Sequence, residues 1–238
     1  MQIQEEMVKV VYEDNHLVVV IKPQNVPVQE DASKDPDLFN AIKEYLKEKY
    51  NKPGNVYLGL LHRLDRPTGG LMVFAKTSKA ASRMSEAIRE GEVEKRYLAV
   101  LVGTPKDRRA TLVNYLKKDE KNNLVKIAPL SESGSKKAVL DYNILQANEK
   151  LSLADISLET GRSHQIRVQF ANIKNPVFGD VKYKGDIVVG ANLSLWSYRL
   201  KFEHPVTKEI MNFVSFPPLE DVPWKYFNIE KLINNTLE

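Results

Sequence analysis

Short apolar stretches alternate with amphipathic ones along this chain, and their spacing predicts a mixture of strands and helices. Short runs of apolar, often β-branched residues bounded by turn residues are typical of strands. Such runs occur at Val8–Tyr12, Leu17–Ile21, Leu71–Ala75, Tyr97–Val102, Val139–Leu145, Leu151–Leu158, Leu193–Phe202 and Ile210–Phe216. Helical spacing predicts helices from a cap at Asp35 or Asp37 to about Tyr50, from a cap at Ser78 through Ile88, and from Ser163 to about Ile173.

The order of these elements predicts an α+β fold. Strands and helices mix without strict alternation, which favours a mixed, mostly antiparallel sheet flanked by helices over a doubly wound one. Residues 104–135 are polar and irregular, so we expect an exposed excursion such as a hairpin. We expect one domain over residues 1–238, with its core at about 8–218 and a tail at 219–238.

Composition removes several classes of protein. The 238 residues include no Cys, which excludes disulfides, Cys-ligated zinc, iron–sulfur clusters and a thiol nucleophile. No apolar run approaches the ~20 residues of a membrane span, so we expect no membrane association. The N-terminus has no basic stretch leading into an apolar one, as a secretory signal would. We therefore expect a cytoplasmic protein.

The distribution of charge suggests a polyanionic partner. Residues 1–58 carry 7 Lys and Arg against 10 Asp and Glu, a net charge of −3. Residues 76–109 carry 9 against 5, and residues 162–184 carry 5 against 1, each a net +4. Two separate basic stretches are typical of a surface that binds a polyanion. Charge alone nevertheless favours the simpler alternative, in which like charges gather on solvated faces.

Several familiar catalytic motifs are absent. The four His have no metal-ligand spacing, so we expect no metal site. The chain also has no phosphate-binding glycine loop, no dinucleotide-binding glycine fingerprint and no nucleophile elbow. What remains is a reaction without a cofactor, or no reaction.

The segment from His62 to Lys76 contains the first candidate catalytic residue. It reads His-Arg-Leu-Asp-Arg-Pro-Thr-Gly-Gly before an apolar strand, so one carboxylate, Asp65, stands between Arg63 and Arg66. Neighbouring cations favour the ionised form of a carboxylate, and an ionised Asp can act as a nucleophile. On spacing alone, an Asp that merely completes a turn is the simpler alternative.

Two further segments carry polar groups at the ends of predicted elements. Thr160 to Arg167 places Arg162 at a junction between a strand and a helix, where an anion is favoured. Lys95-Arg96-Tyr97 places an aromatic residue after two cations, where a base could stack on Tyr97. The simpler alternatives are a helix cap at Ser163 with a solvated Arg167, and a Tyr97 that belongs to the core.

Together these segments resemble the RluA family of pseudouridine synthases. The resemblance continues through Lys22-Pro23, Val26-Pro27, Pro176 to Asp180 with Tyr183, and Leu200 to Pro205, in the family's order and over nearly the whole chain. Gly70 and Gln169 depart from it, because many relatives have Ser in the glycine pair and His in the helix. The chain is similar to the catalytic domain only, without the small RNA-binding domain that precedes it in many members.

The resemblance implies conversion of uridine in RNA to pseudouridine, without a cofactor, in an active-site cleft across the sheet. It implies that Asp65 is the nucleophile, which attacks C1′, adds to C6 of the ring or promotes elimination to a glycal. It also implies that Arg162 pairs with Asp65 and that Tyr97 lies on the face of the uracil. The target base must leave its stack, and Arg63 is placed to fill the vacated space. We expect a monomer, and both ribosomal and transfer RNA remain open as substrates.

The predicted RNA contacts are basic or polar residues of the same motifs: Arg63, Arg66, Thr68, Lys76, Arg96, His164, Gln165 and Arg167. Two other functions remain open. The first is an RNA-binding or ribosome-assembly protein that has the fold but no activity. The second is an unrelated carboxylate enzyme such as a glycosidase, which would need a second acid about 5–10 Å from Asp65. The loop of residues 62–76 supplies no second acid.

Overall fold

The computed structural model describes residues 7–184 and 191–237, and the chain forms two compact units. The first unit comprises the chain up to Lys95 together with Ser197–Ser215. The second comprises Arg96–Trp196 and the chain from Phe216 onward. The polypeptide passes between the units inside two strands, β5 (Glu94–Val102) and β10 (Leu195–Glu203). The expectation of a single domain stays a prediction.

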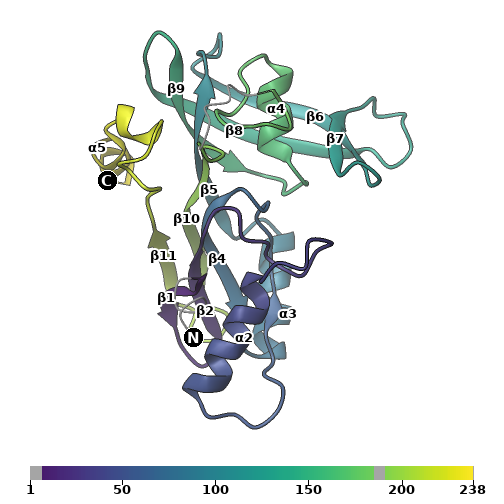
Figure 1. Ribbon diagram of the computed structural model, residues 1–238, viewed down its shortest axis with the longest axis vertical. Helices are drawn as coiled ribbons and strands as arrows, with labels where there is room; N and C mark the ends of the chain where they lie inside the picture. The colour runs from purple at the N-terminus through teal and green to yellow at the C-terminus, as the bar shows by residue number, and fades with distance from the viewer. Residues whose placement is uncertain (1–6, 185–190, 238) are drawn as a thin grey trace. The chain divides into compact units, whose positions relative to one another are not determined.

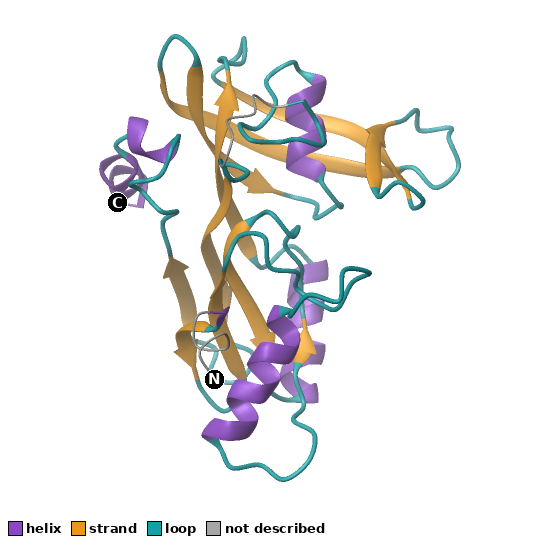
Figure 2. Cartoon of the chain, in the orientation of Figure 1, coloured by secondary structure: helices purple, strands orange, loops and turns teal. Residues whose placement is uncertain are grey.

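The first unit holds a sheet together with the helices α2 (Leu38–Lys49) and α3 (Ser78–Arg89) (Figures 1 and 2). Its strands run in the order β1-β2-β4-β10, with β3 on β4 and β11 on β10. The elements are β1 (Lys9–Glu13), β2 (Leu17–Lys22), α2 (Leu38–Lys49), β3 (Gly59–Leu60), β4 (Gly69–Ala75), α3 (Ser78–Arg89) and β11 (Ile210–Val214). Strand β2 pairs antiparallel with both β1 and β4.

Strands β2 and β4 are buried on both faces. Alternate residues point to opposite faces of a strand, and Val19 opposite Val73 belongs to an apolar cluster with Met84 of α3. The neighbouring residue Phe74 contacts Phe39 of α2, with ring centroids 6.4 Å apart. Burial on both faces explains why both strands read as continuous apolar runs rather than alternating ones.

The second unit is a long antiparallel meander with helix α4 (Gln165–Asn172) against it (Figure 1). Its strand order is β5-β9-β8-β6-β7. The remaining elements are β6 (Arg109–Asp119), β7 (Leu124–Ile127), β8 (Lys136–Ala147), β9 (Leu151–Leu158), α4 (Gln165–Asn172), the 3-10 helix η1 (Trp224–Tyr226) and α5 (Ile229–Leu237). The pairs β5–β9, β9–β8, β8–β6 and β6–β7 are all antiparallel.

Helix α4 packs on the meander through side chains of its inner face. Phe170 makes an edge contact with Tyr142 of β8 at a centroid distance of 5.2 Å. Gln169 is fully buried, and its amide donates to Asn114 Oδ1 of β6 at 2.9 Å and to the Leu112 carbonyl at 3.1 Å. Gln169 therefore joins α4 to β6 through its amide, at a position where relatives often have His.

The α+β class and the mostly antiparallel pairing are confirmed, as is the hairpin, which β6 and β7 form. Asp37 is the cap of α2, since its carboxylate accepts from the Asn40 N–H at 3.0 Å. The predicted cap at Ser78 is wrong by one residue, because Thr77 Oγ1 accepts from the Ala80 N–H at 3.2 Å.

Two other boundaries differ from the sequence expectation. Helix α4 begins at Gln165 rather than Ser163, and His164 precedes it in a left-handed conformation with φ of 52° and no side-chain cap bond. Residues 219–238, expected as a tail, contain η1 and α5, in which Trp224 and Ile233 are buried. A few apolar side chains at helical spacing are enough to fold this short segment onto the second unit.

Candidate functional site

Asp65 lies half-buried in the loop between β3 and β4. The loop is closed by a hydrogen bond of 2.9 Å from the Thr68 N–H to the Asp65 carbonyl. Gly70 leads into β4 with a φ of +115°, and a Cβ at this position would collide with the backbone of Ser197. Only glycine fits there. The glycine pair expected to give a close backbone approach does so at its second member.

A buried lysine, Lys22 at the end of β2, holds this loop. Its ammonium group donates to the carbonyls of Arg66 at 2.9 Å, Pro23 at 2.7 Å and Val26 at 2.7 Å. The side chain is 0% exposed, and burial lowers its pKa to about 7. The Asp65 carboxylate opposes this change and the Arg66 guanidinium adds to it. Lys22 is therefore a buried amino group with a lowered pKa that interacts electrostatically with Asp65.

Replacing Lys22 by Met should destabilise the first unit. The change leaves three carbonyl groups without their donor, so we expect the free energy of unfolding to fall by about 2–4 kcal/mol. Urea unfolding measures it. Lys182→Met is the matched control, because that exposed lysine donates to a single carbonyl, of Asn123, and should change stability by less than about 0.5 kcal/mol. Equal effects of the two variants would contradict a supporting role for Lys22.

His62 is neutral and fastens the loop to β4. Its burial, with a smaller contribution from the nearby Lys95 ammonium, lowers its pKa to about 3. Nε2 accepts a hydrogen bond of 3.1 Å from the Val73 N–H, which leaves the ring proton on Nδ1. The first residue of the motif therefore orients the loop and adds no charge beside Asp65.

The other predicted RNA contacts of this loop have different surroundings. Arg63 is exposed. Arg66 is also exposed, but its guanidinium pairs with the carboxylates of Asp35 and, at 3.6 Å, Asp31. Thr68 is buried, and its hydroxyl has no hydrogen-bond partner among the described residues. Of the three, Arg63 is the residue whose side chain faces solvent without an ion pair to another described residue.

Lys76, at the far end of β4, binds a carboxylate of its own unit. Its Nζ lies 2.6 Å from Glu13, which also accepts from Lys49 at 2.7 Å, Tyr50 at 2.7 Å and Tyr45 at 3.0 Å. Burial alone would raise the pKa of Glu13, but these four hydrogen bonds outweigh it and lower the pKa to about 2. Lys76 thus joins β4 to β1 and the end of α2.

The Glu13 cluster makes the first unit sensitive to acid. A folded pKa of about 2 lies below the ordinary 4.5, so the cluster stabilises the fold above pH 4.5 and the benefit is lost as pH falls toward 2. The difference corresponds to at most about 3 kcal/mol. Urea unfolding between pH 5 and about 2.5 should show wild type losing stability relative to Glu13→Gln. Glu86→Gln, which alters an exposed ion pair with Arg89, should follow wild type. Parallel curves for wild type and Glu13→Gln would contradict the assignment.

In the second unit, β5 carries Arg96 and Tyr97. Tyr97 is 6% exposed and lies opposite Ile156 of β9. Arg96 pairs with the buried carboxylate of Asp155 through two hydrogen bonds, one of them Nε to Oδ1 at 3.1 Å. Because the guanidinium is held by this pair, any RNA contact by Arg96 has to be made by its remaining donors.

Arg162 is exposed on the segment that joins β9 to α4. Its Nε donates to the Lys137 carbonyl at 2.9 Å, and its backbone N–H donates to Gln165 Oε1 at 3.0 Å. Gln165 is 2% exposed, and its Nε2 donates to the Val139 carbonyl at 3.0 Å. The backbone of the exposed Arg162 is thus held in place by the buried amide of Gln165.

His164 and Arg167 belong to a network around Tyr183. His164 Nδ1 lies 2.8 Å from the Tyr183 hydroxyl, and that hydroxyl accepts from the Val125 N–H at 2.8 Å. Arg167 is 5% exposed and makes a bidentate pair with Asp180 at 2.7 and 2.8 Å. A buried bidentate pair of this kind orients both partners. Gln165 and Arg167, expected at the RNA, have their polar groups bonded inside the second unit, and their contact with RNA remains untested.

The predicted site residues fall into two groups, one in each unit. The Asp65 loop brings together Arg63, Asp65, Arg66 and Thr68, while Lys76 lies at the other end of β4. In the second unit, Arg162, His164, Gln165 and Arg167 share the segment that leads into α4, and Arg96 and Tyr97 lie on β5. The pairing of Arg162 with Asp65 and the cleft across the sheet stay predictions.

Sequence reasoning missed Lys22, His62, Thr160 and Tyr183 as residues that support the site. Their motif positions are visible in the sequence, since Lys22 belongs to a Lys-Pro pair and His62 begins the Asp65 motif. The local sequence does not predict that these side chains are directed into the protein interior. Burial and backbone partners are properties of the fold.

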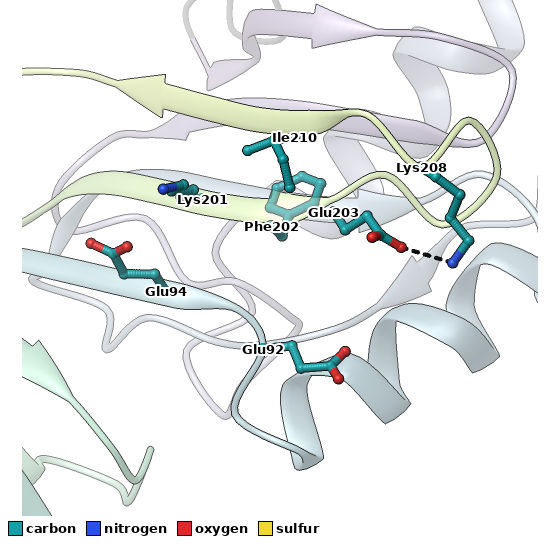
Figure 3. Close-up of a pocket in the computed structure, with 7 residues that line it drawn as sticks. All are labelled: Glu92, Glu94, Lys201, Phe202, Glu203, Lys208 and Ile210. Atoms are coloured by element: carbon teal, nitrogen blue, oxygen red, sulfur yellow. Dashed lines mark hydrogen bonds and ion pairs between the residues drawn. The ribbon is translucent and has the colours of Figure 1, made fainter.

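A pocket of about 480 Å³ lies elsewhere in the first unit (Figure 3). It is lined by Glu92, Glu94, Lys201, Phe202, Glu203, Lys208 and Ile210. Lys208 and Glu203 form an ion pair of 2.8 Å at one end. None of the predicted site residues lines this pocket.

Within residues 7–184 and 191–237, no group of three or more His, Asp or Glu side chains is arranged to hold a metal ion. No helix in the part of the chain that the structure describes is long and apolar enough to cross a membrane.

Curated proteins with similar sequences include several that are named pseudouridine synthases. Ribosomal large subunit pseudouridine synthase D of Vibrio cholerae is 32% identical over 228 residues, which cover 86% of this chain and 65% of that protein. The protein of the same name from Neisseria meningitidis serogroup A is 33% identical over 237 residues, covering 94% of this chain and 61% of that protein. The chain thus spans somewhat less than two thirds of the length of these relatives.

Solved structures show the same fold. Human RNA pseudouridylate synthase domain containing 4 matches with a TM-score of 0.76 and 22% identity, over 91% of this chain and 92% of that chain. Human RNA pseudouridylate synthase domain containing 1 matches with a TM-score of 0.71 over 96% and 94%. The family model for RNA pseudouridylate synthases matches residues 16–172, which include Asp65, Tyr97 and Arg162. The chain therefore belongs to the RNA pseudouridylate synthase family.

Proposed function

We propose that this protein converts uridine to pseudouridine in large-subunit ribosomal RNA. The observation that carries the proposal is the family match over residues 16–172, which contains every predicted catalytic residue. The names of the relatives in Vibrio cholerae and Neisseria meningitidis support the ribosomal substrate. We expect the protein to act as a monomer in the cytoplasm.

The proposed reaction exchanges one bond to the ribose for another. The N1–C1′ bond of the uridine breaks, the C5–C1′ bond forms, C5 loses its proton and N1 gains one, so neither an oxidant nor an energy source is needed. Asp65 supplies the nucleophile. Arg162 supplies a cation that favours the charged form of the nucleophile, and Tyr97 lies on the face of the uracil and helps to remove the C5 proton.

Exposure of the side chain supports Arg63 and Arg66 as the residues of the Asp65 loop that we propose to contact RNA directly. Arg63 is exposed next to Asp65 and is placed to occupy the space that the target base leaves. Arg66 is exposed beside it and would exchange its carboxylate partners for phosphates. Gln165 and Arg167 are buried, so we propose that they support this surface from within.

Tritium release tests the activity and the substrate together. Large-subunit ribosomal RNA and a transfer RNA mixture, both transcribed in vitro with uridine tritiated at C5, are incubated separately with the protein. Release from the ribosomal transcript alone is the expected result. Release from transfer RNA alone would overturn the ribosomal substrate. Binding to either RNA without release would favour a non-catalytic RNA-binding protein.

A further inference from the structure

We propose that Gln165 is a positioning residue that fixes the backbone at Arg162, rather than a residue that contacts RNA. The inference rests on the proposed function, because it assigns Gln165 a role through Arg162. The Gln165 amide would be the group that positions Arg162 for the proposed reaction.

The amide of Gln165 is bonded to three partners around the Arg162 segment. Its Oε1 accepts from the Arg162 N–H at 3.0 Å and from the Thr160 hydroxyl at 2.8 Å. Its Nε2 donates to the Val139 carbonyl at 3.0 Å. The Thr160 hydroxyl in turn accepts from the Val139 N–H at 2.8 Å. This closed set of hydrogen bonds joins the segment before α4 to strand β8.

Other hydrogen bonds also hold the segment: from the Thr160 N–H to the Val139 carbonyl at 3.2 Å, from the Gln165 N–H to the Arg162 carbonyl at 3.2 Å, and from Arg162 Nε to the Lys137 carbonyl at 2.9 Å. A Cβ on Gly161 would meet nothing within 4 Å, so no neighbour packs against that residue. Arg162 is exposed, and the next turn of the chain requires the left-handed conformation of His164. The Arg162 N–H donates to the buried Gln165 amide, which therefore restrains the backbone at this residue directly. Loss of the amide should therefore let the segment sample other conformations.

Because Gln165 is buried, its side chain is not positioned to contact RNA directly. The residue is 2% exposed, and both ends of its amide are used within the second unit. A buried amide with satisfied hydrogen bonds orients its neighbours. Small displacements of a catalytic group cost large factors in rate, about 100-fold for 1 Å.

Helix α4 offers a matched control one turn later. Gln169 is also fully buried, and its Nε2 donates to the carbonyl of Leu112 and to Asn114 on β6. Within the described part of the chain, its amide makes no hydrogen bond to the Arg162 segment. Replacing either glutamine by Met removes a buried amide from the same helix, but only the change at 165 removes the support of Arg162.

The test compares Gln165→Met with Gln169→Met in two measurements. In single-turnover assays with in vitro transcribed large-subunit ribosomal RNA, we expect Gln165→Met to slow pseudouridine formation about 10- to 100-fold with little change in RNA affinity. Gln169→Met should stay within about twofold of wild type at equal folded fraction. Hydrogen exchange of the peptide spanning residues 159–164 should accelerate in Gln165→Met and not in Gln169→Met.

Two further variants keep the proposal falsifiable. Adding Gln165→Met to Arg162→Ala should slow the reaction no further, because the arginine it positions is gone. If Gln165→Met does not fold, Thr160→Val removes the hydroxyl that supports the same amide and should give a smaller effect in the same direction. Equal rates for the two glutamine variants, unchanged exchange at 159–164, or an additive double variant would each overturn the role. Wild-type protein without activity would overturn the proposed function, while the exchange experiment would still decide whether Gln165 holds the segment.

Discussion

Asp65→Asn should abolish pseudouridine formation while RNA binding persists. The amide keeps the size and most of the hydrogen-bonding capacity of the carboxylate, but it cannot act as an anionic nucleophile. We therefore expect the rate to fall by about 10⁴-fold or more. RNA affinity should stay within about tenfold of wild type or improve, because a negative charge beside phosphates has been removed.

Two measurements separate chemistry from binding at Asp65. Tritium release from RNA labelled at C5 of uridine reports the reaction, and a filter-binding titration at one fixed salt concentration reports affinity. Asp221→Asn makes the same chemical change at an exposed position and should leave both unchanged. Residual turnover of a few per cent, in protein checked for deamidation back to Asp, would contradict the nucleophile assignment. Parallel loss of binding and activity would make Asp65 a structural residue of its loop.

The second large effect is expected at Arg162. Arg162→Ala removes the cation proposed to favour the charged nucleophile, so turnover should fall about 100- to 1,000-fold. Stability should change little, because the side chain is exposed and, among the described residues, makes one hydrogen bond, to the Lys137 carbonyl. Arg162→Lys should restore activity only in part, since an ammonium group cannot reproduce a planar fork of donors.

The Arg162 prediction is checked by single-turnover rates and urea unfolding on the same preparations. Arg89→Ala is the control, because it removes an exposed arginine of α3 that pairs with Glu86. Near-normal activity of Arg162→Ala would show that another residue partners the nucleophile. A large loss of stability would instead mean that the segment before α4 depends on the arginine, in which case the rate would not report on chemistry.

Much of the site could be located from the sequence because its motifs are local. Asp65, Arg63 and Arg66 occupy one short loop between apolar strands, and turn residues beside a strand predict such a loop. Gly70 is an example of a backbone requirement visible in advance, since a glycine pair before a strand indicates a close approach.

The roles of the polar residues around Arg162 could not be predicted in this way. Arg167 and Gln165 read as surface residues at the start of a helix, whereas both are buried. Their partners, Asp180 and the Val139 carbonyl, are separated from them by 13 and 26 positions in the chain. Hydrophobic periodicity reports which face of a helix is apolar, and it does not report where a buried carboxylate or carbonyl will be available.

Charge states depend on tertiary structure for the same reason. His62 and Lys22 carry ordinary ionisable groups, but burial lowers their pKa values to about 3 and about 7. Desolvation arises only when distant segments pack around a group. The sequence by itself determined the order of strands and helices apart from β3, η1 and α5, the absence of cysteine chemistry and the motif that carries Asp65, because these follow from local pattern and composition. Only the tertiary structure decided which cations face solvent and which are held inside, because that depends on partners that packing brings together.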